Sequence, residues 1–318
     1  MFTKVKKNFF TKLILLISLL FITASWGFYA HKKINTLAVF TLPKGMIWFY
    51  KNNLSYISEH AVDPDRRRYT DSLEAPRHYL DADHYGIAPF DSIPEKWNDA
   101  VKKYSADTLK AYGLAPWQIQ QTYYSLVKAF EARNGGRILK LSSDIGHYLA
   151  DIHVPLHTTE NYNGQLTHQT GIHAFWESRL PELFCGDYDF LVGKTDYIEN
   201  PLKETWNILR HTNSYKDSVL QIEASLNSRF PADRKFSFVE RSGKIERQYS
   251  EEYSAAYHTA LKGMVEKQMR ASIHEIGSFW YSAWVDAGQP DISNLTNINE
   301  PDTIIVHQQN PGRVREEN

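Results

Sequence analysis

Apolar residues recur three or four positions apart over most of this chain, which predicts a protein built from amphipathic helices. One helix is predicted over 95–113, and a second over 116–136, which opens on a proline and closes on two glycines. A third covers 137–152. Near the end of the chain, 250–288 reads as one long helix with a break expected around Gly277.

Few other patterns compete with the helical one. There is no internal repeat and no strong alternation of the kind that marks strands, so the predicted fold class is all-α, with a single multi-helix domain over 26–288. The pattern is weakest over 190–248, which could be an insertion on that core. Residues 289–318 are polar, and we expect them to form a loosely ordered tail.

The N-terminus has the layout of an export signal. Four lysines precede the apolar run 13–24, which is short for a membrane span but suits the apolar region of a signal peptide. Thr23 and Ser25 are small residues at the positions that signal peptidase reads. We therefore predict a signal peptide over 1–25 and a periplasmic or secreted protein that begins at Trp26; the alternative is an uncleaved anchor.

Charge and cysteine content exclude several classes. Loss of 1–25 removes four of the 36 basic residues and none of the 37 acidic ones, which leaves a net charge of −5 with neutral histidines. A binder of polyanions with a broad basic surface is therefore disfavoured. Cys185 is the only cysteine, so thiolate zinc sites are excluded and any metal must be held by nitrogen and oxygen.

The stretch 146-GHYLADIHVPLH-157 carries the densest candidate chemistry. His147 and Asp151 are four residues apart, so on a helix they project from one face and are placed to bind one cation. His157 follows a proline turn and could return to the same cavity. His153 would face away from that side, and we interpret it as a structural residue.

A second pair with the same spacing is His173 and Glu177. Either pair alone is better explained by a cap or a salt bridge, but two pairs with His157 between them favour a metal centre. Upstream, Asp63 and His78 offer an oxygen and a nitrogen ligand; the alternative is that Asp63 balances the charge of 66-RRR-68.

Taken together, these residues make the chain resemble the superfamily of zinc-dependent phospholipases C and single-strand-specific nucleases. The resemblance runs from 26-WGFYAH-31 through the Asp63 and His78 pair to the two His/acid pairs and ends near Pro181. It implies a mostly helical hydrolase with three zinc ions in a cleft. The spacing of Trp26 and His31 is like that of the nucleases, whereas Glu177 is like the phospholipases.

The resemblance also implies how nine ligands divide among the three ions. The first ion would be held by Asp63, His78, His147 and Asp151, and the second by His157, His173 and Glu177. The third would be held by the α-amino group and carbonyl of Trp26 and by His31, with Asp151 bridging to the first. The amine exists as a ligand only if cleavage follows Ser25.

The expected activity is phosphodiester hydrolysis by a hydroxide that bridges two of the zinc ions, with Asp151 and Asp63 as the catalytic residues. Asp63 would orient the nucleophile or accept its proton. A phospholipid headgroup and a single-stranded nucleic acid both stay open as substrates, and we expect a monomer without a stable protein partner. The alternative from another class is a non-catalytic, zinc-stabilised binding protein of the same fold.

Overall fold

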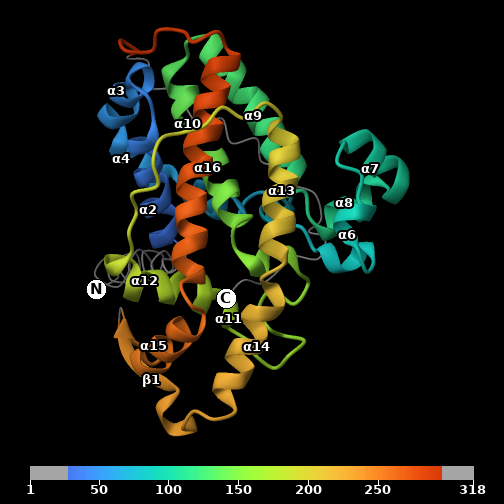
Figure 1. The fold of residues 1–318 in the computed structure, drawn as a ribbon, viewed down its shortest axis with the longest axis vertical. Helices are drawn as coiled ribbons and strands as arrows, with labels where there is room; N and C mark the ends of the chain where they lie inside the picture. Colours follow the sequence, from blue (N-terminus) through green and yellow to red (C-terminus); the bar gives the residue numbers. More distant parts are fainter. Residues whose placement is uncertain (1–27, 242, 296–318) are drawn as a thin grey trace, which may run out of the picture.

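A computed structural model describes residues 28–241 and 243–295. The predicted signal peptide, Trp26 and residues 296–318 lie outside this part of the chain. The described chain forms an all-α fold with one small antiparallel sheet, as the periodicity predicts, and its helices surround the long central helix α10 (Gly135–Asp151) (Figure 1).

The elements follow one another mostly as short helices joined by tight turns. The first part of the chain contains α2 (Phe28–Ala38), η1 (Val39–Thr41), α3 (Lys44–Asn52), α4 (Leu54–His60), α5 (Asp63–Arg67), η2 (Ala75–His78), η3 (Ala82–Tyr85), α6 (Pro89–Ser92), α7 (Trp97–Tyr104), α8 (Ala106–Tyr112) and α9 (Ala115–Glu131). After α10 come η4 (Pro155–Thr158), α11 (Ile172–Ala174), the π-helical turn η5 (Phe175–Arg179), α12 (Leu180–Phe184), η6 (Cys185–Asp187), α13 (Pro201–Asn213), α14 (Lys216–Asn227), η7 (Ala232–Arg234), β1 (Phe236–Arg241), β2 (Lys244–Tyr249), α15 (Glu251–Ala260) and α16 (Met264–Asp286).

Helix α10 is the centre of the bundle because its C-terminal part is buried on every side. It packs against α9, α16, α2 and α4, and residues 142–151 are all buried. Gly146 allows a close approach of α2: a Cβ there would lie 2.0 Å from Asn35 Oδ1. Gly146 directly precedes His147 in the sequence, and it therefore lets α2, which carries His31, pack closely against α10.

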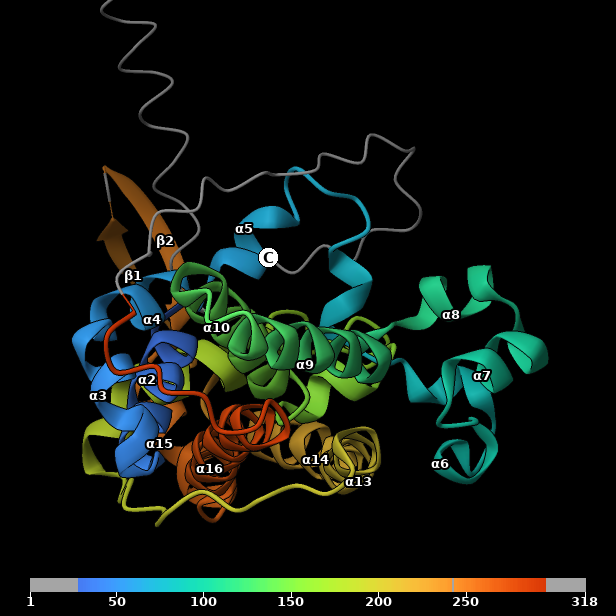
Figure 2. The same cartoon turned by 90° about the horizontal axis from the view of Figure 1, so that it is seen from above.

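Two parts of the molecule stand apart from this bundle. Helices α6, α7 and α8 form a projecting unit on one side (Figure 1). Strands β1 and β2 form a hairpin at the other end, and Figure 2 shows that the hairpin and α5 lie on the same side of the layer that contains α2 and α10. Among the described residues, no helix combines the length and the apolar character needed to cross a membrane.

Several predicted boundaries were wrong for local reasons. The helix predicted over 95–113 is two helices, because Ser105 has a φ of +72° and its side chain caps α8 by accepting from the Thr108 amide. The paired glycines 135 and 136 begin α10 instead of ending α9, with Asn134 as the cap.

The C-terminal helix is also two helices, and the break lies elsewhere than predicted. It falls at Lys262 and Gly263, both at positive φ. Gly277 lies inside α16, and a Cβ there would lie 2.0 Å from Thr41 Oγ1, so the glycine serves close packing instead of ending the helix. After α16, Ile292 is fully buried, so the tail predicted from 289 begins with packed residues.

The hairpin was not predicted, because the sequence shows no strong alternating pattern there. Part of the signal was present: apolar and polar residues alternate over 236-FSF-238, and 242-SG-243 is a dipeptide of a kind that favours turns. The segment 190–248, whose pattern was the weakest, contains α13 and α14 before the hairpin. Helix α13 packs on α9, so part of this segment belongs to the main bundle.

Candidate metal centre

Histidine nitrogens and carboxylate oxygens from six parts of the chain meet beside the C-terminal end of α10. Seven of the nine predicted ligands are among them, together with one residue that was not predicted. They are His31 on α2, Asp65 on α5, His78 on η2, His147 and Asp151 on α10, His157 on η4, and His173 and Glu177 on α11 and η5.

One end of this cluster is built around Asp151. Its Oδ2 lies 2.9 Å from His78 Nδ1 and 3.3 Å from His147 Nε2, and the two histidine nitrogens are 3.1 Å apart. Asp65 Oδ1 lies 3.7 Å from His147 Nε2 and 3.9 Å from His78 Nδ1. This group therefore presents two imidazole nitrogens and two carboxylates around one small volume, a donor set that suits a divalent cation.

The other end is built around Glu177. Its Oε2 lies 2.9 Å from His173 Nε2 and 3.5 Å from His157 Nε2. The π-helical turn keeps His173 and Glu177, four residues apart, on one side of the same helical segment. The three residues form a second compact group whose ligand atoms lie within 4.8 Å of one another.

His31 joins the two ends. Its Nε2 lies 3.1 Å from Glu177 Oε1 and 3.4 Å from Asp151 Oδ1. Both carboxylates thus use one oxygen for His31 and the other for their own histidine pair. This arrangement lets one carboxylate serve two neighbouring cations, as was predicted for Asp151; the same geometry at Glu177 was not predicted.

Backbone carbonyls fix which nitrogen of two of the rings faces the cluster. His147 Nδ1–H donates to the Ala61 carbonyl oxygen at 2.8 Å, and His157 Nδ1–H donates to the His78 carbonyl oxygen at 2.8 Å. With the proton held on Nδ1, each ring directs the lone pair of Nε2 inward. Histidines that bind metals are commonly held in this way, so the local structure fits a metal centre.

The charges in the cluster shift several pKa values strongly. Burial lowers the pKa of His147 well below its ordinary value, and the neighbouring His31 and His78 add to the effect. At His78 burial also lowers the pKa, but the hydrogen bond with Asp151 and the nearby carboxylate of Glu74 outweigh it and raise the pKa to about 9. At Glu177 burial acts against ionisation, and the three surrounding histidines hold its pKa well below the usual range. Glu177 therefore favours its ionised form, balanced by positive charge on its histidine neighbours, whereas burial raises the pKa of Asp65.

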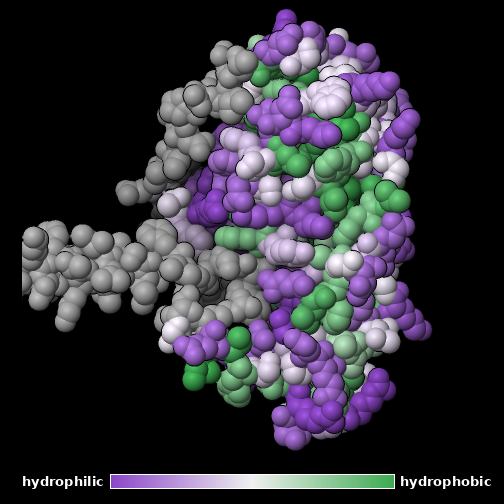
Figure 3. Space-filling model, turned by 90° about the vertical axis from the view of Figure 1, so that its left-hand side faces the viewer, coloured by the Kyte–Doolittle hydropathy of each residue, from purple (hydrophilic) through white to green (hydrophobic). Residues whose placement is uncertain are grey.

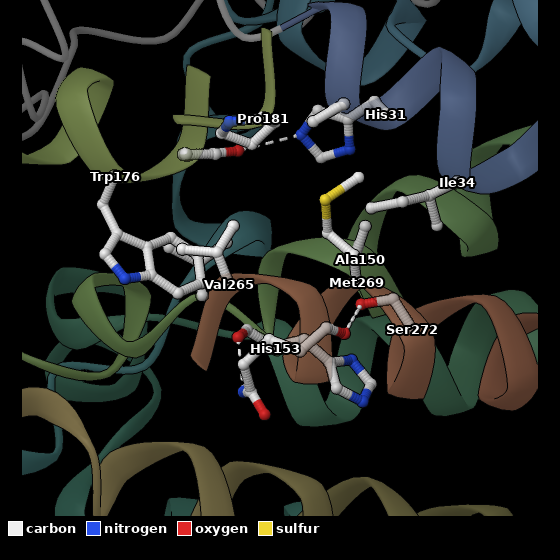
Figure 4. A pocket seen from close by; sticks show the side chains of 13 residues that line it. His31, Ile34, Ala150, His153, Trp176, Pro181, Val265, Met269 and Ser272 are labelled. Carbon is white, nitrogen blue, oxygen red and sulfur yellow. Dashed lines mark hydrogen bonds and ion pairs between the residues drawn. The ribbon is translucent and has the colours of Figure 1, made fainter. Parts of the chain in front are cut away.

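An apolar wall closes the inner side of the cluster. Behind His31 lies a small cavity of about 20 Å³, and Figure 4 shows that its lining includes Ile34, Trp176, Val265 and Met269. Charges beside such a wall interact more strongly than they would in water, because little polar material screens them.

A buried acidic residue supports the outer side of His78. Glu74 is fully buried and lies 3.8 Å from His78 Nε2. It accepts hydrogen bonds from Tyr148, Arg67 and Arg77. No pattern in the sequence indicated that Glu74 and its arginine partners would be buried beside a ligand.

Asp63 is the one described residue of the predicted set that the structure does not bring to the cluster. Its carboxylate instead pairs with His60 Nδ1 at 2.6 Å and with Arg66 Nη1 at 3.0 Å. Asp65 points to the other side of the short helix α5 and occupies the place predicted for Asp63. Asp63 and Asp65 are two residues apart in the sequence. The resemblance assigned the ligand to Asp63, and this is the acid that faces away from the cluster.

His153 matches the structural role predicted for it. It is buried, and its Nδ1–H donates to the Leu149 carbonyl oxygen at 2.7 Å. Trp26, the remaining predicted ligand, lies outside the described residues, so its role stays a prediction.

Comparison with known proteins gives two findings. The family described as zinc dependent phospholipase C matches residues 30–236, which include all eight clustered ligands. Nuclease S1 of Aspergillus oryzae (strain ATCC 42149 / RIB 40) is 26% identical over 193 residues, which are 55% of this chain and 61% of that protein. The chain therefore spans about three fifths of the curated relative that it matches.

Proposed function

The chain belongs to the zinc-dependent phospholipase C family, and from this premise we propose that it is a zinc-dependent hydrolase of phosphodiester bonds. The observation that carries the proposal is the convergence of five histidines and three carboxylates at one buried place. A protein that kept this site only for stability would close it with four ligands per ion. Eight clustered ligands with shared carboxylates favour a multinuclear catalytic site.

We assign the ligands to three zinc ions. His78, His147, Asp151 and Asp65 would hold the first, and His157, His173 and Glu177 the second. His31 would hold the third, with Asp151 and Glu177 as carboxylates shared with the other two. The α-amino group and carbonyl of Trp26 would complete this third set, as the resemblance implies.

The residues of the chain then have separate tasks. Zinc held by these residues would activate water at neutral pH and supply positive charge for the phosphate oxygens. Asp151 and Glu177 keep the ligand groups of neighbouring ions close together, and the carbonyls of Ala61 and His78 hold two rings in position. Asp65 takes over the orienting or proton-accepting role that was predicted for Asp63, because it is the acid that lies beside His78 and His147.

Two substrate classes follow from the two comparisons. The family description points to a phospholipid headgroup, and the name of the Aspergillus relative points to a nucleic acid. We further propose that the protein is exported by its N-terminal segment 1–25 and acts as a monomer outside the cytosol. Processing and activity would then be coupled, because cleavage creates the amine of Trp26.

The test is hydrolysis by purified protein beginning at Trp26. Short-chain phosphatidylcholine and single-stranded DNA are offered in parallel, with and without a chelator, and the Asp151→Asn variant is the control. We expect chelator-sensitive cleavage of one substrate by the parent protein and a large loss in the variant. Zinc-loaded protein that cleaves neither these substrates nor a soluble aryl phosphodiester would refute the proposed function and favour a binding protein.

A further inference from the structure

The β1–β2 hairpin has no role in the proposed chemistry, and its outer face is unusual. The strands pair with Phe238 opposite Arg247 and Glu240 opposite Ile245. Because side chains alternate along each strand, Phe238 and Ile245 lie on the same face as diagonal neighbours. Phe236 and Tyr249, also paired, belong to this face at its inner end.

This face changes from buried to exposed along its length. At the inner end, the Tyr249 ring stacks on Phe175 with ring centres 3.9 Å apart, and Phe236 packs on Tyr249. Farther out, Phe238 is 71% exposed and Ile245 is 77% exposed. Two large apolar side chains held side by side in water by a sheet of only two strands indicate a surface that meets a partner.

The charge around this face indicates the kind of partner. By sequence, the hairpin 236–249 contains three basic residues and two acidic ones, a net charge of +1 in a chain whose net charge is −1. The guanidinium of Arg247 lies 4.4 Å from the centre of the Phe236 ring, beside the exposed pair. Apolar side chains flanked by cations suit a bilayer surface with anionic headgroups, where the apolar groups enter and the cations remain among phosphates.

Single-stranded nucleic acid fits the same face less well. Phe238 and Arg247 offer one ring and one guanidinium plane on which bases can stack, but Ile245, the more exposed of the two apolar side chains, offers neither and is stabilised only in an apolar phase. The aromatic rings at the inner end are already stacked within the protein.

The hairpin is also well placed relative to the metal centre. Phe175, on which Tyr249 stacks, lies in η5 between the ligands His173 and Glu177. Figure 2 shows the hairpin on the same side of the bundle as α5, which carries Asp65. In the space-filling view, hydrophobic residues reach the surface among hydrophilic ones at the lower end of the molecule (Figure 3).

We infer that the exposed pair Phe238 and Ile245, with Arg247 beside it, docks the protein on a phospholipid bilayer that carries anionic headgroups. This inference rests on the proposed function and deepens it, because docking would bring the phospholipid of a bilayer to the side of the molecule where α5 lies. Binding to a bilayer needs neither zinc nor hydrolysis, so an experiment can refute the docking inference without refuting the proposed activity, and the reverse.

The experiment measures partition of the whole protein, carrying Asp151→Asn to prevent hydrolysis, onto phosphatidylcholine vesicles with and without phosphatidylglycerol. The test variant adds Phe238→Ser and Ile245→Ser. The matched control adds Ile87→Ser and Tyr124→Ser, two other large side chains that are 106% and 53% exposed. We expect at least about a tenfold weaker partition for the test variant alone, because two apolar side chains no longer leave water. Arg247→Gln should weaken binding to the anionic vesicles only.

Three results would overturn the inference. They are no vesicle binding by the parent, equal binding by parent and test variant, and a loss in the test variant that appears with single-stranded DNA instead of vesicles. The same hairpin changes, made in the zinc-loaded parent, should leave hydrolysis of a soluble aryl phosphodiester unchanged. That assay tests catalysis alone, so a failure there concerns the proposed function and leaves the vesicle result intact.

Discussion

Two buried acidic groups in this protein have opposite kinds of neighbours. Glu223, on α14, is fully buried and accepts hydrogen bonds from Tyr253 OH at 2.6 Å, Lys235 Nζ at 3.0 Å and Gln169 Nε2 at 2.6 Å. Glu177 is also buried, but its oxygens face the Nε2 atoms of His31, His157 and His173. One acid is balanced by donors of the protein, and the other lies among groups that bind cations.

The comparison shows that burial of an acid is not by itself a sign of function. Both carboxylate oxygens of Glu223 accept from donors of the protein, so the group is complete without a ligand. Around Glu177 and Asp151, the rings of His147 and His157 donate their Nδ1–H to backbone carbonyls and direct the lone pair of Nε2 toward the cluster. Acceptors that converge in this way are stable only if cations or protons lie between them.

The largest effect should come from removing the metal. Because the acceptors of the cluster would lose their cations, we expect chelation to reduce phosphodiester hydrolysis by at least about 1000-fold, and added zinc to restore it. Initial rates and zinc content by mass spectrometry measure both. Activity that persists in zinc-free protein would contradict the assignment of this cluster.

A matched pair of substitutions tests the comparison directly. Glu177→Gln should reduce hydrolysis by at least about 100-fold and lower the zinc content, since a shared carboxylate is lost. Glu223→Gln makes the same change in the other buried acid. It should keep zinc and activity but lower the free energy of unfolding by about 1.5–3 kcal/mol, because it weakens charged hydrogen bonds. Zinc loss in the Glu223→Gln variant would show that the two acids are not separate.

A second pair decides between the two aspartates of α5. We expect Asp65→Asn to reduce zinc affinity or activity about 10–100-fold, the range seen when groups around a metal are lost. Asp63→Asn weakens the pairing with His60 and Arg66 outside the cluster, so its effect should stay within about twofold. Zinc titration and initial rates compare the variants. A larger loss of zinc affinity or activity in Asp63→Asn than in Asp65→Asn would show that Asp63, the residue predicted from the sequence, is the ligand.

The smallest effect should come from the contact that brings α2 to the cluster. In Gly146→Ala, the added methyl group would meet Asn35, and overpacking of this kind typically costs about 1–3 kcal/mol. Because α2 carries His31, zinc affinity should fall as well. Gly186→Ala is the control, since a Cβ there meets nothing within 4 Å. Denaturant unfolding and zinc titration measure both effects. A Gly146→Ala variant with unchanged stability and zinc affinity would contradict the close contact.

Much of the site was readable from local spacing. His147 with Asp151 and His173 with Glu177 are four residues apart, and a helix necessarily places such pairs on one face. The presence of a single cysteine was enough to restrict the ligands to nitrogen and oxygen. The long helices α9 and α10 were also found, because packing and periodicity agree there. Their ends depended on caps such as Asn134, whose role the glycine pattern obscured.

The amino-acid sequence by itself determined the helical class, the kind of ligand atoms and the two His/acid pairs, because these depend on residue identity and on contacts within one turn of helix. Only the tertiary structure decided that Asp65 and not Asp63 faces His147, and that His31 lies between Asp151 and Glu177. It also decided that Glu223 is complete with protein donors alone. These contacts join residues far apart in the chain, and their geometry follows from how helices such as α2 and α10 pack, which no short spacing encodes.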